Sequence, residues 1–235
     1  MEGIIFDKDG TLIDFDAFWL DISVEALQDV LNICHLPDIP LLDILEPLGV
    51  QNAVTSIEGV LCKGTYAQMG EIVYNVLKRN GYAGNLPDTQ KLVEDMYVKN
   101  SNAGHILPTC ENLKEALRTL KNRGIKLAVV TTDNREMTVK CLDALGITEL
   151  FDAIYTDDGQ IPTKPDPACA EDFCQRFGMA KEKVLMVGDT LTDVQFAKNA
   201  GLSMVGVAKT EENKGILNRH IQRVIPDVSY LPAMI

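Results

Sequence analysis

The sequence lacks the long apolar runs that membrane proteins need. No stretch of its residues approaches the roughly 20 apolar positions of a spanning helix. The opening segment, MEGIIFDKDG, is too short and turns acidic too soon to resemble a secretory signal. Internal repeats and low-complexity tracts are missing as well. We therefore expect a globular, cytoplasmic protein without a membrane partner.

Basic residues are scarce relative to acidic ones. The chain has 22 lysines and arginines against 34 aspartates and glutamates, which gives a formal net charge of −12. A strongly acidic chain repels the phosphate backbone of nucleic acids, so we expect no nucleic-acid partner. Any anionic ligand would need a bound divalent cation or local hydrogen-bond donors to offset this charge.

Paired cysteine motifs are also absent. None of the six cysteines forms a C-x-x-C pair, and several lie on apolar helix faces, where a free thiol behaves as a small hydrophobe. We expect reduced, buried thiols in a reducing compartment. The six are Cys34, Cys62, Cys110, Cys141, Cys169 and Cys174.

Short apolar runs alternate with helical patterns over much of the chain. Residues 3–6 form an apolar run that stops abruptly at Asp7, as expected of a buried strand followed by a polar loop. Further strands are predicted at 126–130, 153–155, 184–187 and 203–207. Strict alternation of strand and helix predicts an α/β fold, an open parallel Rossmann-like sheet with helices on both faces.

The segment after the first strand has helical periodicity instead. Apolar residues recur at the spacing of one helix face in three sets, Trp19 to Ile33, Met69 to Val76 and Leu92 to Tyr97. We therefore predict an α/β core formed by residues 1–14 and 104–235. Residues 15–103 would form an inserted all-α domain.

Polar side chains gather at the predicted carboxyl ends of the strands, where open α/β sheets bind their ligands. The set comprises Asp7, Asp9, Thr131, Lys164, Asp189 and Asp193. Each member has a structural explanation on its own, as a turn residue, a helix cap or a solvated lysine. Together, however, the carboxylates would repel one another unless a cation neutralised them, and a few hard oxygen ligands suit Mg²⁺.

Four motifs in this set resemble those of the haloacid dehalogenase (HAD) superfamily and occur in its order. They are Asp7-Lys8-Asp9-Gly10-Thr11, the strand ending at Thr131, Lys164-Pro165, and Gly188-Asp189 through Asp193. The first and fourth are the specific ones. The helical insertion is similar to the family's cap. Within the superfamily the chain looks most like the phosphoglycolate phosphatase and β-phosphoglucomutase branch.

The resemblance implies a Mg²⁺-dependent phosphatase that works through an aspartyl phosphate. Asp7 would be the nucleophile, and Asp9 would be the general acid and then the general base. Asp7, the backbone carbonyl of Asp9, and Asp189 would hold the metal. Dehalogenases lack a carboxylate two residues after the nucleophile, because they protonate no alkoxide. Asp9 therefore favours phosphoryl transfer.

The same resemblance implies how the phosphate would be bound. Thr131 would hydrogen-bond a phosphoryl oxygen, Thr132 would offer its backbone N–H, and Gly10 would allow a tight backbone path beside the phosphate. Lys164 would neutralise charge on the nucleophile and the transferring group. Asp193 would either bind the metal indirectly or orient Lys164.

Two positions depart from the pattern of the relatives. Phe15 stands where many relatives place a small hydroxyl residue, which leaves the substrate open. After Thr131, relatives often carry Asn and then a basic residue, whereas this chain has Thr132 and Asp133. Asp133 would disfavour a second negative charge on the substrate, unless Arg135 compensates.

Three functions compete on this sequence. We expect hydrolysis of a small phosphate ester, phosphoglycolate-like or a sugar phosphate, by a monomer or homodimer. A phosphomutase of the β-phosphoglucomutase type is the alternative within the same fold. A phospho-receiver-like binding module is disfavoured, because its phosphoacceptor lies on a later strand and its chain is about half as long.

Overall fold

The computed structural model describes residues 1–101 and 103–235. The chain divides into two compact units. The first, here the core unit, combines Met1–Phe15 with Ile106–Ile235, and the second, here the insert, is Asp16–His105. These bounds lie within a few residues of those predicted from the sequence. A cap function for the insert stays a prediction. Among the described helices, none has both the length and the apolar character needed to cross a membrane.

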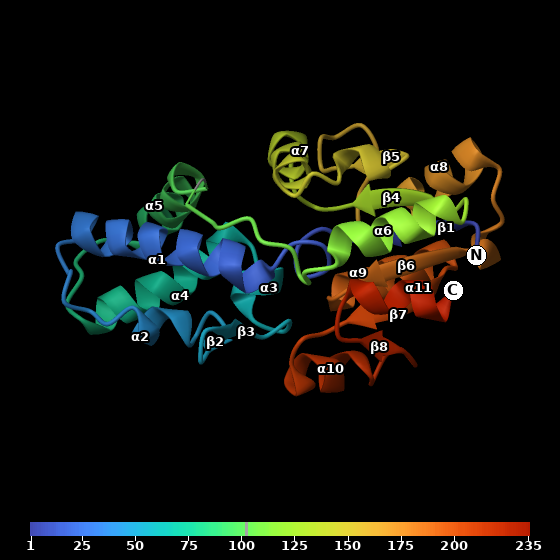
Figure 1. Cartoon of the computed structure of the whole chain (residues 1–235). Coiled ribbons are helices and arrows are strands. Elements are labelled where there is room, and N and C mark those ends of the chain that lie inside the picture. The colour runs from blue at the N-terminus through green and yellow to red at the C-terminus, as the bar shows by residue number, and fades with distance from the viewer. Residues whose placement is uncertain (102) are drawn as a thin grey trace. The chain divides into compact units, whose positions relative to one another are not determined.

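Within the described residues, six parallel strands form the sheet of the core unit, in the order β5-β4-β1-β6-β7-β8 (Figure 1). The strands are β1 Gly3–Phe6, β4 Lys126–Val130, β5 Ala153–Tyr155, β6 Val184–Gly188, β7 Ser203–Val207 and β8 Val224–Ile225. The predicted parallel α/β sheet is confirmed. The short strand β8 was not predicted, because two residues give no periodic signal.

Strand β1 lies inside the sheet, between strands from distant parts of the sequence. Ile5 is in register with Ala128 of β4 on one side and with Met186 of β6 on the other. Every residue of β1 and of β6 is buried. A parallel strand that is covered on both faces has no solvent side, which is why these strands are continuous apolar runs rather than alternating patterns.

Helices cover the two faces of this sheet. The core-unit helices are α6 Leu113–Asn122, α7 Arg135–Ala144, α8 Ala168–Phe177, α9 Leu191–Ala200, α10 Glu211–Leu217 and α11 Leu231–Met234, with 3₁₀ turns η1 Thr148–Leu150, η2 Lys181–Lys183 and η3 Val228–Tyr230. On one face, Phe173 of α8 and Phe196 of α9 pack in a buried cluster with strand residues such as Ile5. Helices α6 and α11, which contact each other, lie over the near side of the sheet in Figure 1.

The insert is mostly helical, but it also contains a hairpin. Its helices are α1 Phe15–Ile33, whose first residue belongs to the core unit, α2 Leu42–Leu45, α3 Val60–Lys63, α4 Tyr66–Arg79 and α5 Leu86–Lys99. Strands β2 (Val50–Gln51) and β3 (Val54–Thr55) pair antiparallel across Asn52 and Ala53, which both have positive φ. The sequence did not predict this hairpin, because its strands are short and its turn is not the usual Asn-Gly.

We expect removal of the Phe173 ring to destabilise the core unit. Phe173 is fully buried in the cluster between α8 and the sheet. Phe173→Ala should cost about 3–5 kcal/mol in unfolding free energy, because the loss of buried area adds to the cost of the cavity. Urea unfolding followed by circular dichroism measures this. The matched control is Gln175→Ala on the exposed side of the same helix, which should stay within about 0.5 kcal/mol. Equal stabilities of the two variants would contradict the packing described.

Candidate active site

The site residues predicted from the sequence follow the carboxyl ends of neighbouring strands in the core unit. Asp7 comes directly after β1, and Thr131 comes directly after β4. Both extend the hydrogen bonding of the sheet by one residue, since the Asp7 N–H donates to the Val187 carbonyl (2.9 Å) and the Thr131 N–H donates to the Tyr155 carbonyl (3.1 Å). The backbones of Asp7 and Thr131 are therefore held in place by hydrogen bonds to the sheet.

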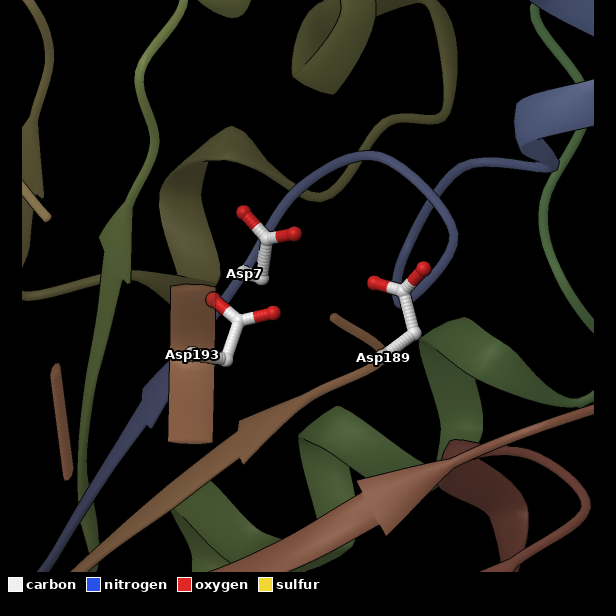
Figure 2. A group of neighbouring side chains, drawn as sticks. All are labelled: Asp7, Asp189 and Asp193. Carbon is white, nitrogen blue, oxygen red and sulfur yellow. The ribbon is translucent and has the colours of Figure 1, made fainter. Parts of the chain in front are cut away.

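Three carboxylates from the two ends of the chain meet at this edge. Asp7, Asp189 and Asp193 each have an oxygen within 4.8 Å of the others (Figure 2). All three side chains are buried, and Asp193 has no exposed surface. Asp189 follows β6, and Asp193 lies in the first turn of α9. The parallel register of β1 and β6 thus brings together residues that are far apart in the sequence.

Lys164 lies between two of these carboxylates. Its Nζ donates to Asp7 Oδ1 at 2.5 Å and to Asp193 Oδ1 at 2.7 Å. The other oxygen of Asp193 accepts from the backbone N–H (2.9 Å) and the hydroxyl (2.8 Å) of Thr190, in a capping box at the start of α9. Both oxygens of Asp193 are thereby occupied, and Lys164 is held by the end of a helix.

The loop after Asp7 supports Asp189. Thr11 Oγ1 donates to Asp189 Oδ1 at 3.0 Å, and the Thr109 hydroxyl donates to the carbonyl of Thr11 at 2.8 Å. Gly10 has φ +75°, and a Cβ at this position would lie 2.0 Å from Asp189 Oδ2. Only glycine therefore allows the loop to pass this close to the carboxylate.

A second charged cluster involves Lys8, which has no exposed surface. Its Nζ lies 3.0 Å from Asp9 Oδ2 and 2.8 Å from Asp133 Oδ2. The other oxygen of Asp133 accepts from the Asn134 N–H at 2.7 Å. Asp133 is therefore already paired with a cation. From the sequence, Asp133 was expected to disfavour a second negative charge on the substrate. The ion pair with Lys8 offsets part of the charge on which that expectation depends.

The two threonines at the end of β4 differ in exposure. Thr131 is buried, and its hydroxyl accepts from the backbone N–H of Asp133 at 3.2 Å. Thr132 is exposed. Arg135, which was considered as compensation for Asp133, directs a guanidinium N–H to the carbonyl of Ile154 at 3.5 Å. The phosphate-binding functions of Gly10, Thr131 and Thr132 stay predictions.

Burial and mutual repulsion dominate the electrostatics of the carboxylates. Burial raises the pKa of Asp7 from 3.8 to about 7, the charge of Asp193 adds to this, and Lys164 partly opposes it. Burial, followed by the charges of Asp7 and Asp193, raises the pKa of Asp189 well above its usual value. Burial alone would lower the pKa of Lys164, but the charges of Asp193 and Asp7 outweigh it and raise that pKa, so the lysine stays protonated.

The donor set fits a hard divalent cation. Asp7 and Asp189 present buried carboxylate oxygens close together, and a single lysine does not neutralise the three acids of the cluster. Carboxylate oxygens are the ligands that Mg²⁺ prefers, and a cation would reverse the cost of ionising these groups. Since Asp193 already uses both oxygens, Asp7 and Asp189 are the side chains suited to hold the ion.

Several contacts at this site were not predicted from the sequence. Lys8 and Thr11 were given no function, although both lie inside the first motif. Thr190 was not identified as the cap of α9, although a threonine three residues before an aspartate is a recognisable helix-start signal. The partner of Lys8, Asp133, lies on another strand end, and no local pattern identifies such a pair.

Stability without divalent cations should fall as the pH rises from about 4 to about 7. A carboxylate with a raised folded-state pKa stabilises the fold while it is protonated, and this contribution is lost as the pH passes through that pKa. We expect a loss on the order of a few kcal/mol, visible in EDTA as a thermal midpoint that falls between pH 4 and pH 7 and changes little above pH 7. Added Mg²⁺ should raise the thermal midpoint more at pH 8 than at pH 5, because metal ligands must be deprotonated.

The matched variants for this experiment are Asp189→Asn and Glu136→Gln. The first removes a charge from the buried cluster, and the second removes a charge from an exposed position on α7. Asp189→Asn should flatten the pH dependence and lose most of the Mg²⁺ effect, whereas Glu136→Gln should keep both. If the wild-type protein and both variants showed the same dependence on pH and the same effect of Mg²⁺, the cluster would bind no cation.

Known proteins resemble this chain over part of its length. Pyrophosphatase PpaX from Halalkalibacterium halodurans is 38% identical over 123 residues, which are 49% of this chain and 57% of that protein. Phosphoglycolate phosphatase from Pasteurella multocida is 38% identical over 96 residues, which are 41% of this chain and 43% of that protein. The similarity thus spans about half the length of these curated relatives.

Solved structures match nearly the whole chain, and a protein family matches most of its residues. A phosphoglycolate phosphatase predicted for Haemophilus somnus 129pt matches with a TM-score of 0.73 at 22% identity, covering 100% of this chain and 97% of that one. YfnB from Bacillus subtilis, solved with bound magnesium, matches with a TM-score of 0.72 at 21% identity, covering 99% and 97%. Such identities show the fold alone. The family of haloacid dehalogenase-like hydrolases matches residues 1–201, and the chain therefore belongs to this family, as its motifs predicted.

Proposed function

We propose that the chain is a Mg²⁺-dependent phosphatase that hydrolyses a small phosphorylated metabolite through an aspartyl phosphate on Asp7. The observation that carries this proposal is the position of Asp7, which is bonded to Lys164 and lies within 4.8 Å of Asp189. A nucleophilic carboxylate needs cations beside it in order to approach an anionic phosphoryl group. The names of the relatives, phosphoglycolate phosphatase and pyrophosphatase, support the same reaction class.

The metal would be held by Asp7, Asp189 and the backbone carbonyl of Asp9. When bound, Mg²⁺ supplies positive charge that offsets the negative charge of the phosphoryl oxygens. Thr11, which donates to Asp189 Oδ1, would help to keep that ligand in place. Gly10 leaves room for this arrangement, since a larger residue would collide with Asp189.

The reaction has two displacements at phosphorus. An oxygen of Asp7 bonds to the phosphorus, and the bond to the ester oxygen breaks, so that this oxygen takes the electron pair and accepts a proton from Asp9. Asp9 then takes a proton from water, the water oxygen bonds to the phosphorus, and the bond to Asp7 breaks to release phosphate. Lys164 holds Asp7 and offsets charge, while Thr131, Thr132 and Gly10 bind the phosphoryl oxygens.

Asp193 acts through Lys164 in this proposal. Its Oδ1 bonds to Lys164 and its Oδ2 is used by Thr190, so no oxygen of Asp193 is left without a donor. Of the two functions open from the sequence, metal binding and orientation of the lysine, the contacts favour orientation. The position of Asp193 in the first turn of α9 fixes the lysine to a rigid element.

The substrate class is the finer part of the proposal. Phosphoglycolate-like esters and sugar phosphates are the expected substrates, and the resemblance to pyrophosphatase PpaX adds pyrophosphate to the candidates. A phosphomutase remains the competing activity within the same fold. A panel of phosphorylated metabolites separates these alternatives, because a phosphatase releases phosphate with Mg²⁺ whereas a mutase isomerises its substrate without release.

Asp7→Asn should abolish phosphate release from whichever ester the wild-type protein hydrolyses. An amide of the same shape is a far poorer nucleophile, and loss of a catalytic nucleophile costs on the order of 10³-fold or more. Phosphate release measures the effect. Asp157→Asn, which removes a charge from an exposed loop, is the control and should keep the wild-type rate. A wild-type rate in Asp7→Asn would remove the basis of the mechanism.

Asp9→Asn should slow the reaction by about 10²–10⁴-fold, the usual contribution of a positioned acid or base. Because the loss of the base also slows hydrolysis of the intermediate, a labelled phosphoenzyme should be trapped by acid quench. Asp158→Asn, in the same exposed loop as the previous control, should show neither effect. Unchanged turnover in Asp9→Asn would exclude Asp9 as the proton donor.

A further inference from the structure

Lys8 is a fully buried lysine beside the proposed general acid. Lysine is almost never completely buried unless it is paired, and here the pairing is double, with Asp9 at 3.0 Å and Asp133 at 2.8 Å. Neither carboxylate belongs to the group formed by Asp7, Asp189 and Asp193. The ammonium group of Lys8 therefore forms ion pairs with two aspartates that Lys164 does not contact.

The contacts of Asp9 are one-sided. Its Oδ2 faces Lys8 Nζ, whereas its Oδ1 is buried and has no hydrogen-bond partner among the residues that the structure describes. The ion pair with Lys8 is then the interaction that fixes the orientation of this carboxyl group. Without it, the short side chain of Asp9 could rotate among its staggered positions.

Asp133 anchors Lys8 from the other side. Its Oδ1 accepts from the Asn134 N–H at 2.7 Å, and its own N–H donates to Thr131 Oγ1 at 3.2 Å. Thr131 is in turn bonded to the backbone of Tyr155, at the end of β5. A continuous chain of contacts therefore connects the ends of β4 and β5 through Asp133 and Lys8 to the carboxyl group of Asp9.

We propose that Lys8 is a positioning residue that holds the carboxyl group of Asp9 in place for proton transfer, and that Asp133 fixes Lys8. This inference rests on the proposed phosphatase function. In the first displacement the proton of Asp9 passes to the leaving oxygen as that oxygen takes the electron pair of the breaking P–O bond. A misplaced Asp9 therefore slows the loss of a leaving group that needs this proton.

The test compares two leaving groups in the full-length protein. Lys8→Met should lower kcat/KM for an alkyl phosphate, the best substrate from the metabolite panel, at least about 10-fold more than for p-nitrophenyl phosphate. The p-nitrophenolate ion is stable without a proton, so its release depends little on Asp9. The parameter kcat/KM reports the first displacement, which keeps the second step out of the comparison.

Two further variants separate positioning from folding. Lys8→Met leaves Asp133 without its cation, so Lys8→Met/Asp133→Asn should recover thermal stability but keep the altered leaving-group preference. In an Asp9→Asn background, Lys8→Met should cause no further loss, because residues that act as one unit are not additive. A clear further loss in that background would overturn the proposal.

The outcomes distinguish this inference from the proposed function. An equal loss for both esters in Lys8→Met would show that Lys8 acts on the phosphate or on the fold, and would overturn the positioning function alone. Restoration of the wild-type preference in the double variant would also overturn it. If the wild-type protein releases phosphate from neither ester, both the proposed function and this inference fail.

Discussion

The ion pairs of Lys164 hold together a site that would otherwise repel itself. Three buried carboxylates lie within 4.8 Å of one another, and Lys164 contacts two of them. Removing one partner of a buried ion pair typically costs about 3–5 kcal/mol, because an unpaired charge stays in a medium that solvates it poorly. The repulsion that remains makes the cluster suited to a divalent cation. Burial, followed by this repulsion, raises the pKa values of Asp7 and Asp189.

The scaffold makes this concentration of charge sterically possible by using glycine at two points. A Cβ at Gly10 would meet Asp189, and a Cβ at Gly188 would lie 2.4 Å from the Asp193 carboxyl carbon. Both glycines lie at the carboxyl edge of the sheet, one in the loop after β1 and one at the end of β6. The close approach of the acids therefore requires glycine, which has no Cβ, at both positions.

Two buried lysines at this edge of the sheet are each shared by two aspartates. Lys164 is shared by Asp7 and Asp193, and Lys8 is shared by Asp9 and Asp133. For both lysines, burial opposes the charge, but the neighbouring acids outweigh burial and raise the pKa, so both stay protonated. An acidic protein with a net charge of −12 thus concentrates two fixed cations at the edge where an anionic substrate would bind.

The sequence by itself determined the family, the parallel sheet and the residues that gather at its edge. These follow from local signals, since apolar runs mark the buried strands and acidic motifs follow where the strands end. Only the tertiary structure decided which charges pair. The hairpin at residues 50–55 has strands too short for a periodic signal, and the contact of Lys8 with Asp133 joins two strand ends that are distant in the sequence. Such pairs depend on strand order and register, which no single stretch of sequence encodes.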